Sequence, residues 1–98
     1  MQMHFEWDPK KAASNLRKHK VSFAEAAEVF RDPLAITVPD DEHAEQEERW
    51  ITLGQGNNRR LVVVIHTWRD DEDSSDIVHV RIVSAREATA HELQQYEG

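Results

Sequence analysis

The sequence predicts a small α+β domain, in which an antiparallel β-sheet carries helices on one face and the elements follow the order β-α-α-β-β-β-β-α. Two capping boxes of the Ser/Thr-x-x-Glu type, at Ser22 and Thr89, predict helix starts. Two long β-branched runs, 61–69 and 78–86, flank an acidic turn and predict a hairpin. The length of 98 residues fits one domain, 1–98.

The first expected elements are a short strand at 5–7 and a basic helix. Asp8-Pro9 supplies an N-cap and a proline at the first helical position, so the helix should run from Pro9 to about His19. Ser22 then begins a second helix, in which Phe23, Ala26, Ala27 and Phe30 have the spacing of one buried face. Arg31-Asp32-Pro33 should end it.

Strands dominate the remaining sequence. We expect a strand at 34–38 closed by Pro39, a solvated acidic loop from Asp40 to Glu48, and strands at 49–54 and 61–69 joined by turn residues 54–58. Strand 78–86 follows the acidic turn. The capping box at Thr89 predicts a last helix from Ala90 to Tyr96, with the Tyr96 side chain packed and its hydroxyl tethered.

The register of the last hairpin decides which side chains share a face. Placing Arg69 opposite Ile77 puts Ile65 opposite Arg81. One face then has a polar end formed by Thr67, Arg69, His79 and Arg81. The other face is more apolar and should pack under the helices; it carries Val62, Val64, His66, Trp68, Val78, Val80, Ile82, Ser84 and Arg86.

Composition narrows the possible functions. The chain has no cysteine, which excludes disulfides and thiolate chemistry, and its six histidines show no metal-ligand spacing. No apolar run could span a membrane and no signal peptide is evident, so we expect a soluble cytoplasmic protein. The net charge is −7, yet segments 40–49 and 70–76 hold most of the acid and the rest carries about +3. A local basic surface for nucleic acid is therefore possible.

Motifs at both ends of the chain resemble one family. They are Phe5-x-Trp7-Asp8-x-x-Lys11-Ala12-x-x-Asn15-x-x-Lys18-His19-x-Val21-x-Phe23, then Glu48-Arg49, Arg60-Leu61-x-Val63-Val64, Thr67, Arg81-Ile82-x-Ser84-Ala85-Arg86-x-Ala88-Thr89, Glu92 and Tyr96. Over nearly the whole chain these residues are similar to the BrnT toxins of type II toxin–antitoxin modules. Lys20 stands where that family usually has glycine, and the last helix lacks the basic residues usual there.

The resemblance implies a RelE-like fold and a metal-independent endoribonuclease that needs no cofactor and arrests translation. It also implies a BrnA-like ribbon-helix-helix antitoxin as partner, RNA as substrate, and contact with operator DNA only through the antitoxin complex. No contact with a membrane is implied.

Arginines are the leading site candidates. A guanidinium in an apolar strand must be paired or face a site, and its planar fork matches phosphate oxygens. Arg81 and Arg86 are therefore expected to contact the scissile phosphate, although a structural ion pair with Glu48 or Glu6 is an equal alternative for each. The remaining catalytic candidates are Lys18, His19 and Arg49. The candidates for RNA contacts are Lys11, Arg60 and Arg69.

Two other functions stay open. The acidic balance and the missing basic residues of the last helix fit a degenerate toxin that persists as an antitoxin-binding corepressor. Alternatively the chain is a plain interaction module whose arginines are structural.

Overall fold

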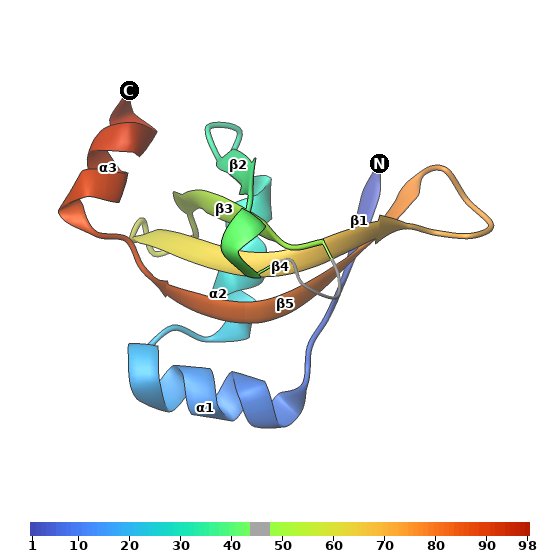
Figure 1. Cartoon of the computed structure of the whole chain (residues 1–98), viewed down its shortest axis with the longest axis horizontal. Helices are drawn as coiled ribbons and strands as arrows, with labels where there is room; N and C mark the ends of the chain where they lie inside the picture. Colours follow the sequence, from blue (N-terminus) through green and yellow to red (C-terminus); the bar gives the residue numbers. More distant parts are fainter. Residues whose placement is uncertain (44–47) are drawn as a thin grey trace.

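The computed structural model describes residues 1–43 and 48–98, apart from the His43 side chain, and forms one curved sheet with helices (Figure 1). The α-helices are α1 (Pro9–His19), α2 (Phe23–Glu28) and α3 (Ala90–Glu97). The strands are β1 (Gln2–Glu6), β2 (Ile36–Pro39), β3 (Trp50–Gln55), β4 (Leu61–Asp70) and β5 (Ile77–Glu87). Short 3-10 turns occupy Val29–Arg31 and Asp41–His43. The expected α+β class is confirmed.

The sheet is mixed rather than antiparallel. Its strand order is β1-β5-β4-β3-β2, and β1 runs parallel to β5 with Met3 beside Val78 and Phe5 beside Val80. The prediction of a purely antiparallel sheet was therefore wrong. The strands that follow one another, β2 to β5, are antiparallel as expected. The first strand instead joins the last, because Met3 and Phe5 pack against the main core from that edge.

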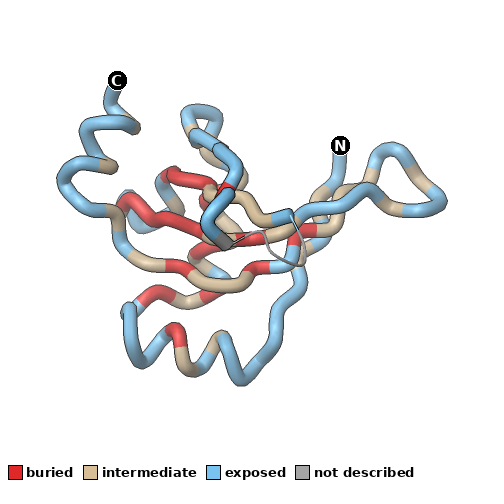
Figure 2. Tube along the Cα trace, viewed as in Figure 1, coloured by how far each residue is buried: buried red, intermediate tan, exposed pale blue. Residues whose placement is uncertain are grey.

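Helices cover both faces of the sheet, not one. α1 and α2 lie on one face and α3 on the other (Figure 1). The main core lies under α1 and α2 and contains Val21, Phe23, Ala26, Val29, Val62, Val64, Val80, Ile82 and Ala85. A smaller cluster on the α3 side contains Leu53, Leu61 and Val63, with Tyr96 of α3 packed on it. Buried residues concentrate along the central strands (Figure 2).

The last hairpin differs from the expected register by two residues near its turn and contains a β-bulge further along. Ile65 pairs with Ser84 but the next residue, His66, pairs with Ile82, so β5 has one extra residue there. The predicted register was wrong on both sides of the bulge, because Arg69 pairs with His79 rather than Ile77, and Ile65 pairs with Ser84 rather than Arg81. Beyond the bulge, the side chains of β5 alternate in the opposite sense. Ser84 and Arg86 therefore lie on the face away from α1 and α2, and not on the helix-covered face as predicted. Ala85 enters the core instead.

Asn15 of α1 fixes the strand just beyond this bulge. Its buried amide donates to the carbonyl oxygens of Val21 at 3.0 Å and Ala85 at 2.8 Å. Its side-chain oxygen accepts the Ala85 backbone N–H at 3.1 Å. One side chain thus ties α1, the α1–α2 turn and β5 together. Both N–H donors of its amide and one acceptor site of its oxygen are thereby used.

The helix ends follow the sequence signals. Asp8 caps α1, Ser22 caps α2, and Thr89 and Glu92 form the reciprocal capping box at α3. Lys20 ends α1 in the left-handed conformation, with φ of 59°, a position that glycine adopts more readily. The turn after α1 therefore keeps the geometry typical of glycine.

The acidic loop is only partly as expected. Asp40 is buried at 5 % exposure, which contradicts a fully solvated loop. Its backbone N–H donates to the Arg49 carbonyl oxygen at 2.9 Å, which brings the two ends of the segment together. Positions 44–47 of the predicted loop lie outside the described residues. None of the described helices is long and apolar enough to cross a bilayer.

Candidate functional site

A polar cleft of about 270 Å³ opens on the sheet face opposite α1 and α2. Its lining residues are Glu6, Glu48, Thr67, Trp68, Arg69 and Arg81. Strand pairing brings them together, because Arg81 lies beside Glu6 on β1 and opposite Thr67 on β4. Paired residues on neighbouring strands are about 5 Å apart at Cα. The cleft thus combines two guanidinium groups with two carboxylates.

A histidine pair lies next to this cleft on β1 and β5. His79 is paired with Arg69 across the hairpin and with His4 on β1. The two imidazole rings meet edge to face, with centroids 5.6 Å apart. His79 shares a strand face with Arg81, two residues along, so their Cα atoms are about 7 Å apart. A titratable ring therefore stands close to both arginines.

Asp71 orients the His79 ring. The Nε2 atom of His79 lies 2.7 Å from Asp71 Oδ1, and the side chains are only partly exposed. The hydrogen bond from His79 is the main cause that lowers the pKa of Asp71 below its usual range. The Asp71 carboxylate therefore fixes the orientation of the His79 ring beside the arginines.

A buried histidine supports the sheet beneath Trp68. His66 is fully buried, with its Nε2 2.7 Å from the Thr52 hydroxyl and its ring packed edge to face on Phe30 and Trp68. Burial lowers the pKa of His66 to about 4. His66 is therefore a neutral structural group, and it is not open to the cleft.

Arg86 lies away from the cleft, at the other end of β5. About 15 Å of strand separates it from Arg81. Its guanidinium makes a bidentate ion pair with Glu92, with both N–O distances at 2.8 Å. Arg86 lowers the pKa of Glu92 to about 2. Glu92 also completes the capping box of α3, so this ion pair fastens α3 to the end of the strand.

Arg60 is likewise held by a carboxylate. Its Nε and Nη2 atoms lie 2.7 Å and 2.6 Å from the two oxygens of Glu25, and Nη2 also donates to the Lys20 carbonyl oxygen. The sequence predicted Ser22 and Glu25 as a capping box. Ser22 accepts the Glu25 N–H as expected, while the Glu25 carboxylate binds Arg60. This ion pair joins the start of β4 to α2.

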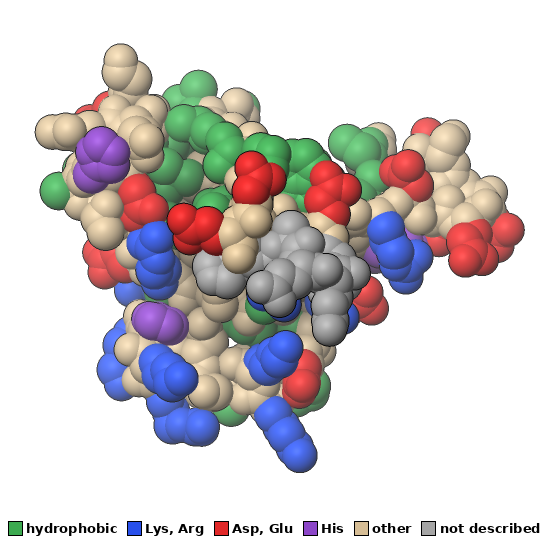
Figure 3. Space-filling view, viewed as in Figure 1, with side chains coloured by type: hydrophobic (Ala, Val, Ile, Leu, Met, Phe, Trp, Pro, Cys, Tyr) green, Lys and Arg blue, Asp and Glu red, His purple; other side chains and the backbone are tan. Residues whose placement is uncertain are grey.

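The basic residues of α1 form a separate surface. Lys11, Lys18 and His19 are exposed on α1, on the opposite side of the sheet from the cleft (Figure 1). In the space-filling view, Lys and Arg side chains gather over α1, while acidic side chains occupy the protruding β4–β5 turn (Figure 3). The structure therefore does not bring Lys18 or His19 beside Arg81.

Arg49 precedes β3, directly after the cleft residue Glu48. Its Nε atom is buried and, within the described residues, has no hydrogen-bond partner. Its location next to Glu48 keeps it near the cleft, although the cleft lining itself includes Glu48 rather than Arg49.

Several cleft residues were not among the sequence candidates. The sequence predicted Glu6 and Glu48 only as ion-pair partners of the arginines, and it did not indicate Asp71 or His4. His79 was predicted on the strand face of Arg81 but was not among the catalytic candidates. The available signal was the predicted strand face shared by Arg69, His79 and Arg81. Across residues 1–43 and 48–98, no three metal-binding side chains cluster.

The fold and cleft define a small α+β domain whose sheet carries a polar cleft with two arginines and two carboxylates. A family model described as "Ribonuclease toxin, BrnT, of type II toxin-antitoxin system" matches residues 7–92, and the chain belongs to this family. The expected family membership is thus confirmed. It assigns the chain to ribonuclease toxins that act with an antitoxin partner.

A solved structure shares the fold. It is the crystal structure of the Brucella abortus ribonuclease toxin BrnT, with a TM-score of 0.63 and 21 % sequence identity, and the match covers 91 % of this chain and 99 % of that one. At that identity the likeness establishes the fold alone. No curated protein sequence matched the chain.

Proposed function

We propose that the chain is a metal-independent endoribonuclease that cleaves single-stranded RNA in the cleft containing Arg69 and Arg81. The observation that carries the proposal is the convergence of two arginines and two carboxylates beside the His79–Asp71 pair. Cleavage of RNA without metal needs a base, a cation and an acid, and this cleft offers all three.

The cleavage step distributes these roles. A carboxylate of the cleft, Glu6 or Glu48, takes the proton from the ribose 2′-hydroxyl. The 2′-oxygen forms a bond to phosphorus, and the bond from phosphorus to the 5′-oxygen breaks. Arg69 and Arg81 stabilise the added negative charge, and His79 donates a proton to the departing oxygen. The products are a 2′,3′-cyclic phosphate and a 5′-hydroxyl.

Arg86 and Arg60 have structural roles in this proposal, because carboxylates of this chain already bind both guanidinium groups. Lys11, Lys18 and His19 would contribute only to attraction of RNA at a distance, since they lie on the other side of the sheet. The proposal also includes a RelE-like fold, arrest of translation, and neutralisation by a BrnA-like ribbon-helix-helix antitoxin. Operator DNA would be contacted through that antitoxin, and the protein would act in the cytoplasm.

The test is cleavage of RNA by purified protein in the presence of a metal chelator. Arg81→Gln should lower the rate about 100-fold or more, as expected for the loss of a transition-state cation. Glu6→Gln and Glu48→Gln then identify the base, because only one should abolish the reaction. The matched control is Arg17→Gln, an exposed arginine of α1 outside the cleft, which should cleave normally.

A catalytically degenerate, antitoxin-binding corepressor is the second candidate. It is favoured by the acidic surroundings of the cleft, where Glu6, Glu48 and the β4–β5 turn oppose an RNA backbone. A folded wild-type chain that neither cleaves RNA nor arrests growth, yet binds antitoxin, would establish this candidate and contradict the ribonuclease. A partner-binding module with structural arginines would instead show Arg81→Gln lowering the melting temperature.

A further inference from the structure

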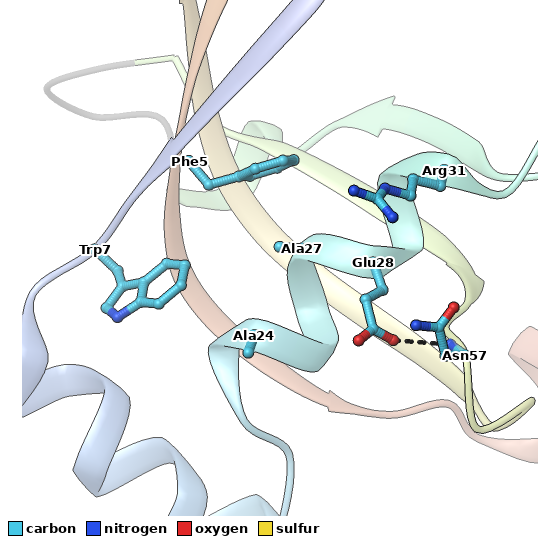
Figure 4. A pocket seen from close by; sticks show the side chains of 7 residues that line it. All are labelled: Phe5, Trp7, Ala24, Ala27, Glu28, Arg31 and Asn57. Carbon is cyan, nitrogen blue, oxygen red and sulfur yellow. Dashed lines mark hydrogen bonds between the residues drawn. The ribbon is translucent and has the colours of Figure 1, made fainter.

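A second cavity lies between the end of β1 and α2, on the helix-covered side of the sheet (Figure 4). Its volume is about 360 Å³. Two aromatic side chains, Phe5 and Trp7, form one wall, and the small side chains of Ala24 and Ala27 leave the space in front of them open (Figure 4). None of these residues belongs to the cleft described above.

Two further aromatic side chains pack against the aromatic wall and fix it in place. The Phe5 ring packs on Phe30 with centroids 5.3 Å apart, and the Trp7 ring meets Phe23 edge to face at 6.0 Å. Trp7 nevertheless remains 37 % exposed. An exposed ring fixed by core aromatics is a stacking surface that needs no rearrangement to accept a flat ligand.

The opposite side of the cavity is polar. Arg31 points its guanidinium toward the Phe5 ring (Figure 4), and within the described residues no carboxylate pairs with it. One oxygen of Glu28 accepts the backbone N–H of Asn57 at 2.9 Å, so the carboxylate is held in place. Gly56 permits this approach, because a Cβ there would lie 3.3 Å from the same oxygen.

We propose that this cavity binds one unpaired guanine base of the RNA substrate, and the inference rests on the proposed ribonuclease function. Single-stranded bases are recognised by stacking on aromatic rings and by hydrogen bonds to the base edge. Of the four bases, guanine presents a ring N–H next to an amino group, and a fixed carboxylate such as Glu28 can accept both. Arg31 supplies the cation for a neighbouring phosphate.

The cavity and the cleft are within reach of one RNA strand. Glu6 lines the cleft, and its neighbours in sequence, Phe5 and Trp7, line the cavity. Adjacent residues are about 3.8 Å apart at Cα and point to opposite faces of a strand. Because β1 is an edge strand, RNA can pass around its free side from one site to the other. The cavity would therefore select a base close to the cleaved bond.

The first test measures binding of the four nucleoside 5′-monophosphates to the wild-type protein. Binding is detected through the indole N–H resonance of Trp7 in NMR spectra. Guanosine monophosphate should shift this resonance and bind at least about tenfold more tightly than the others. Arg31→Gln should weaken binding, Ala24→Leu should fill the cavity and block it, and Glu28→Gln should erase the preference for guanine. Arg17→Gln is the control for charge.

The second test is cleavage of short RNA oligonucleotides with or without a guanosine near the scissile bond. If wild type cleaves RNA but Ala24→Leu, Arg31→Gln and Glu28→Gln cleave as fast and with the same preference, the cavity assignment is wrong and the ribonuclease stands. If guanosine monophosphate binds but RNA is not cleaved, the ribonuclease fails and the cavity stands. Loss of antitoxin binding in these variants, without nucleotide binding by wild type, would assign the cavity to a protein partner and overturn the proposal.

Discussion

Replacing Asn15 with alanine should destabilise the protein by about 3 kcal/mol. The buried amide makes three hydrogen bonds, to the Val21 carbonyl and to both backbone groups of Ala85. Each such bond contributes about 1 kcal/mol net, and the loss leaves buried backbone groups without this partner. For a domain of this size the melting temperature should fall by roughly 12 to 24 °C.

The assay is equilibrium unfolding in urea, monitored by circular dichroism. Gln95→Ala is the matched control, because it also removes an amide from a helix but at an exposed position, and it should change stability by less than about 0.5 kcal/mol. A loss below about 1 kcal/mol for Asn15→Ala, or one equal to the control, would refute the reasoning that this side chain clamps α1 to β5.

A charge variant adds a pH signature to the same test. In Asn15→Asp the new carboxylate faces two carbonyl oxygens, so its pKa in the folded protein should rise above its unfolded value. The variant should therefore be less stable than wild type at pH 7 and should regain part of that stability as the pH falls and the carboxyl group takes up a proton. A constant difference between the two proteins at every pH would contradict the predicted orientation of the amide.

Four further variants test other contacts by the same unfolding assay. Burial lowers the pKa of His66 from 6.5 to about 4, so the unfolded chain binds this proton at a higher pH than the folded protein does. The free energy of unfolding of wild type should therefore fall by about 3 kcal/mol between pH 6.5 and 4, and His66→Gln should remove this decline. Glu92→Gln should lower the free energy of unfolding by about 1 kcal/mol at pH 7, a value reduced because its partner Arg86 is partly exposed. The difference from wild type should shrink as the pH falls from 4.5 through about 2, because wild-type Glu92 is protonated in both states below that pH. Gly54→Ala should lower the free energy of unfolding by roughly 1 to 3 kcal/mol, because its Cβ would lie 2.9 Å from Cγ1 of Val29, whereas Gly56→Ala should lower it less because the nearest atom to its Cβ, Oε2 of Glu28, would lie 3.3 Å away.

The local elements could be predicted because their signals are local. The caps at Asp8, Ser22 and Thr89 involve side chains within three residues of the backbone groups they bind, and the observed helices begin where these caps predict. Strands β4 and β5 were evident from their β-branched residues, within one residue at each end. The tethered hydroxyl of Tyr96 was also expected, and it donates to Asp32 at 2.6 Å and has a pKa raised to about 12.

The long-range arrangement could not be predicted from such signals. No residue near Val83 indicates a bulge, because the hydrogen bonds that secure Ala85 beyond it come from Asn15, 70 positions away. Without the bulge, Arg86 would share a face with Ile82 and could not reach Glu92. Parallel pairing of β1 with β5 likewise depends on contacts between the two ends of the chain.

Only part of the candidate site could be predicted, because the rest depends on the same long-range pairing. Arg69 and Arg81 were expected on one strand face, since both lie on strands that form a hairpin. Glu6 comes from β1, and its presence beside Arg81 requires the parallel pairing that the sequence pattern did not indicate. Residues brought in from distant segments are those that sequence reasoning left out.

The pairing of β1 with β5 also sets when the proposed cleft can form during synthesis. Arg81 follows Glu6 by 75 positions, so at about 5 to 20 residues per second a ribosome needs about 4 to 15 s between them. Until then β1 has no strand beside it, and contacts of such long sequence separation form late in folding. A chain interrupted before β5 would carry the basic helix α1 but no assembled cleft, so incomplete translation products should lack the proposed nuclease activity.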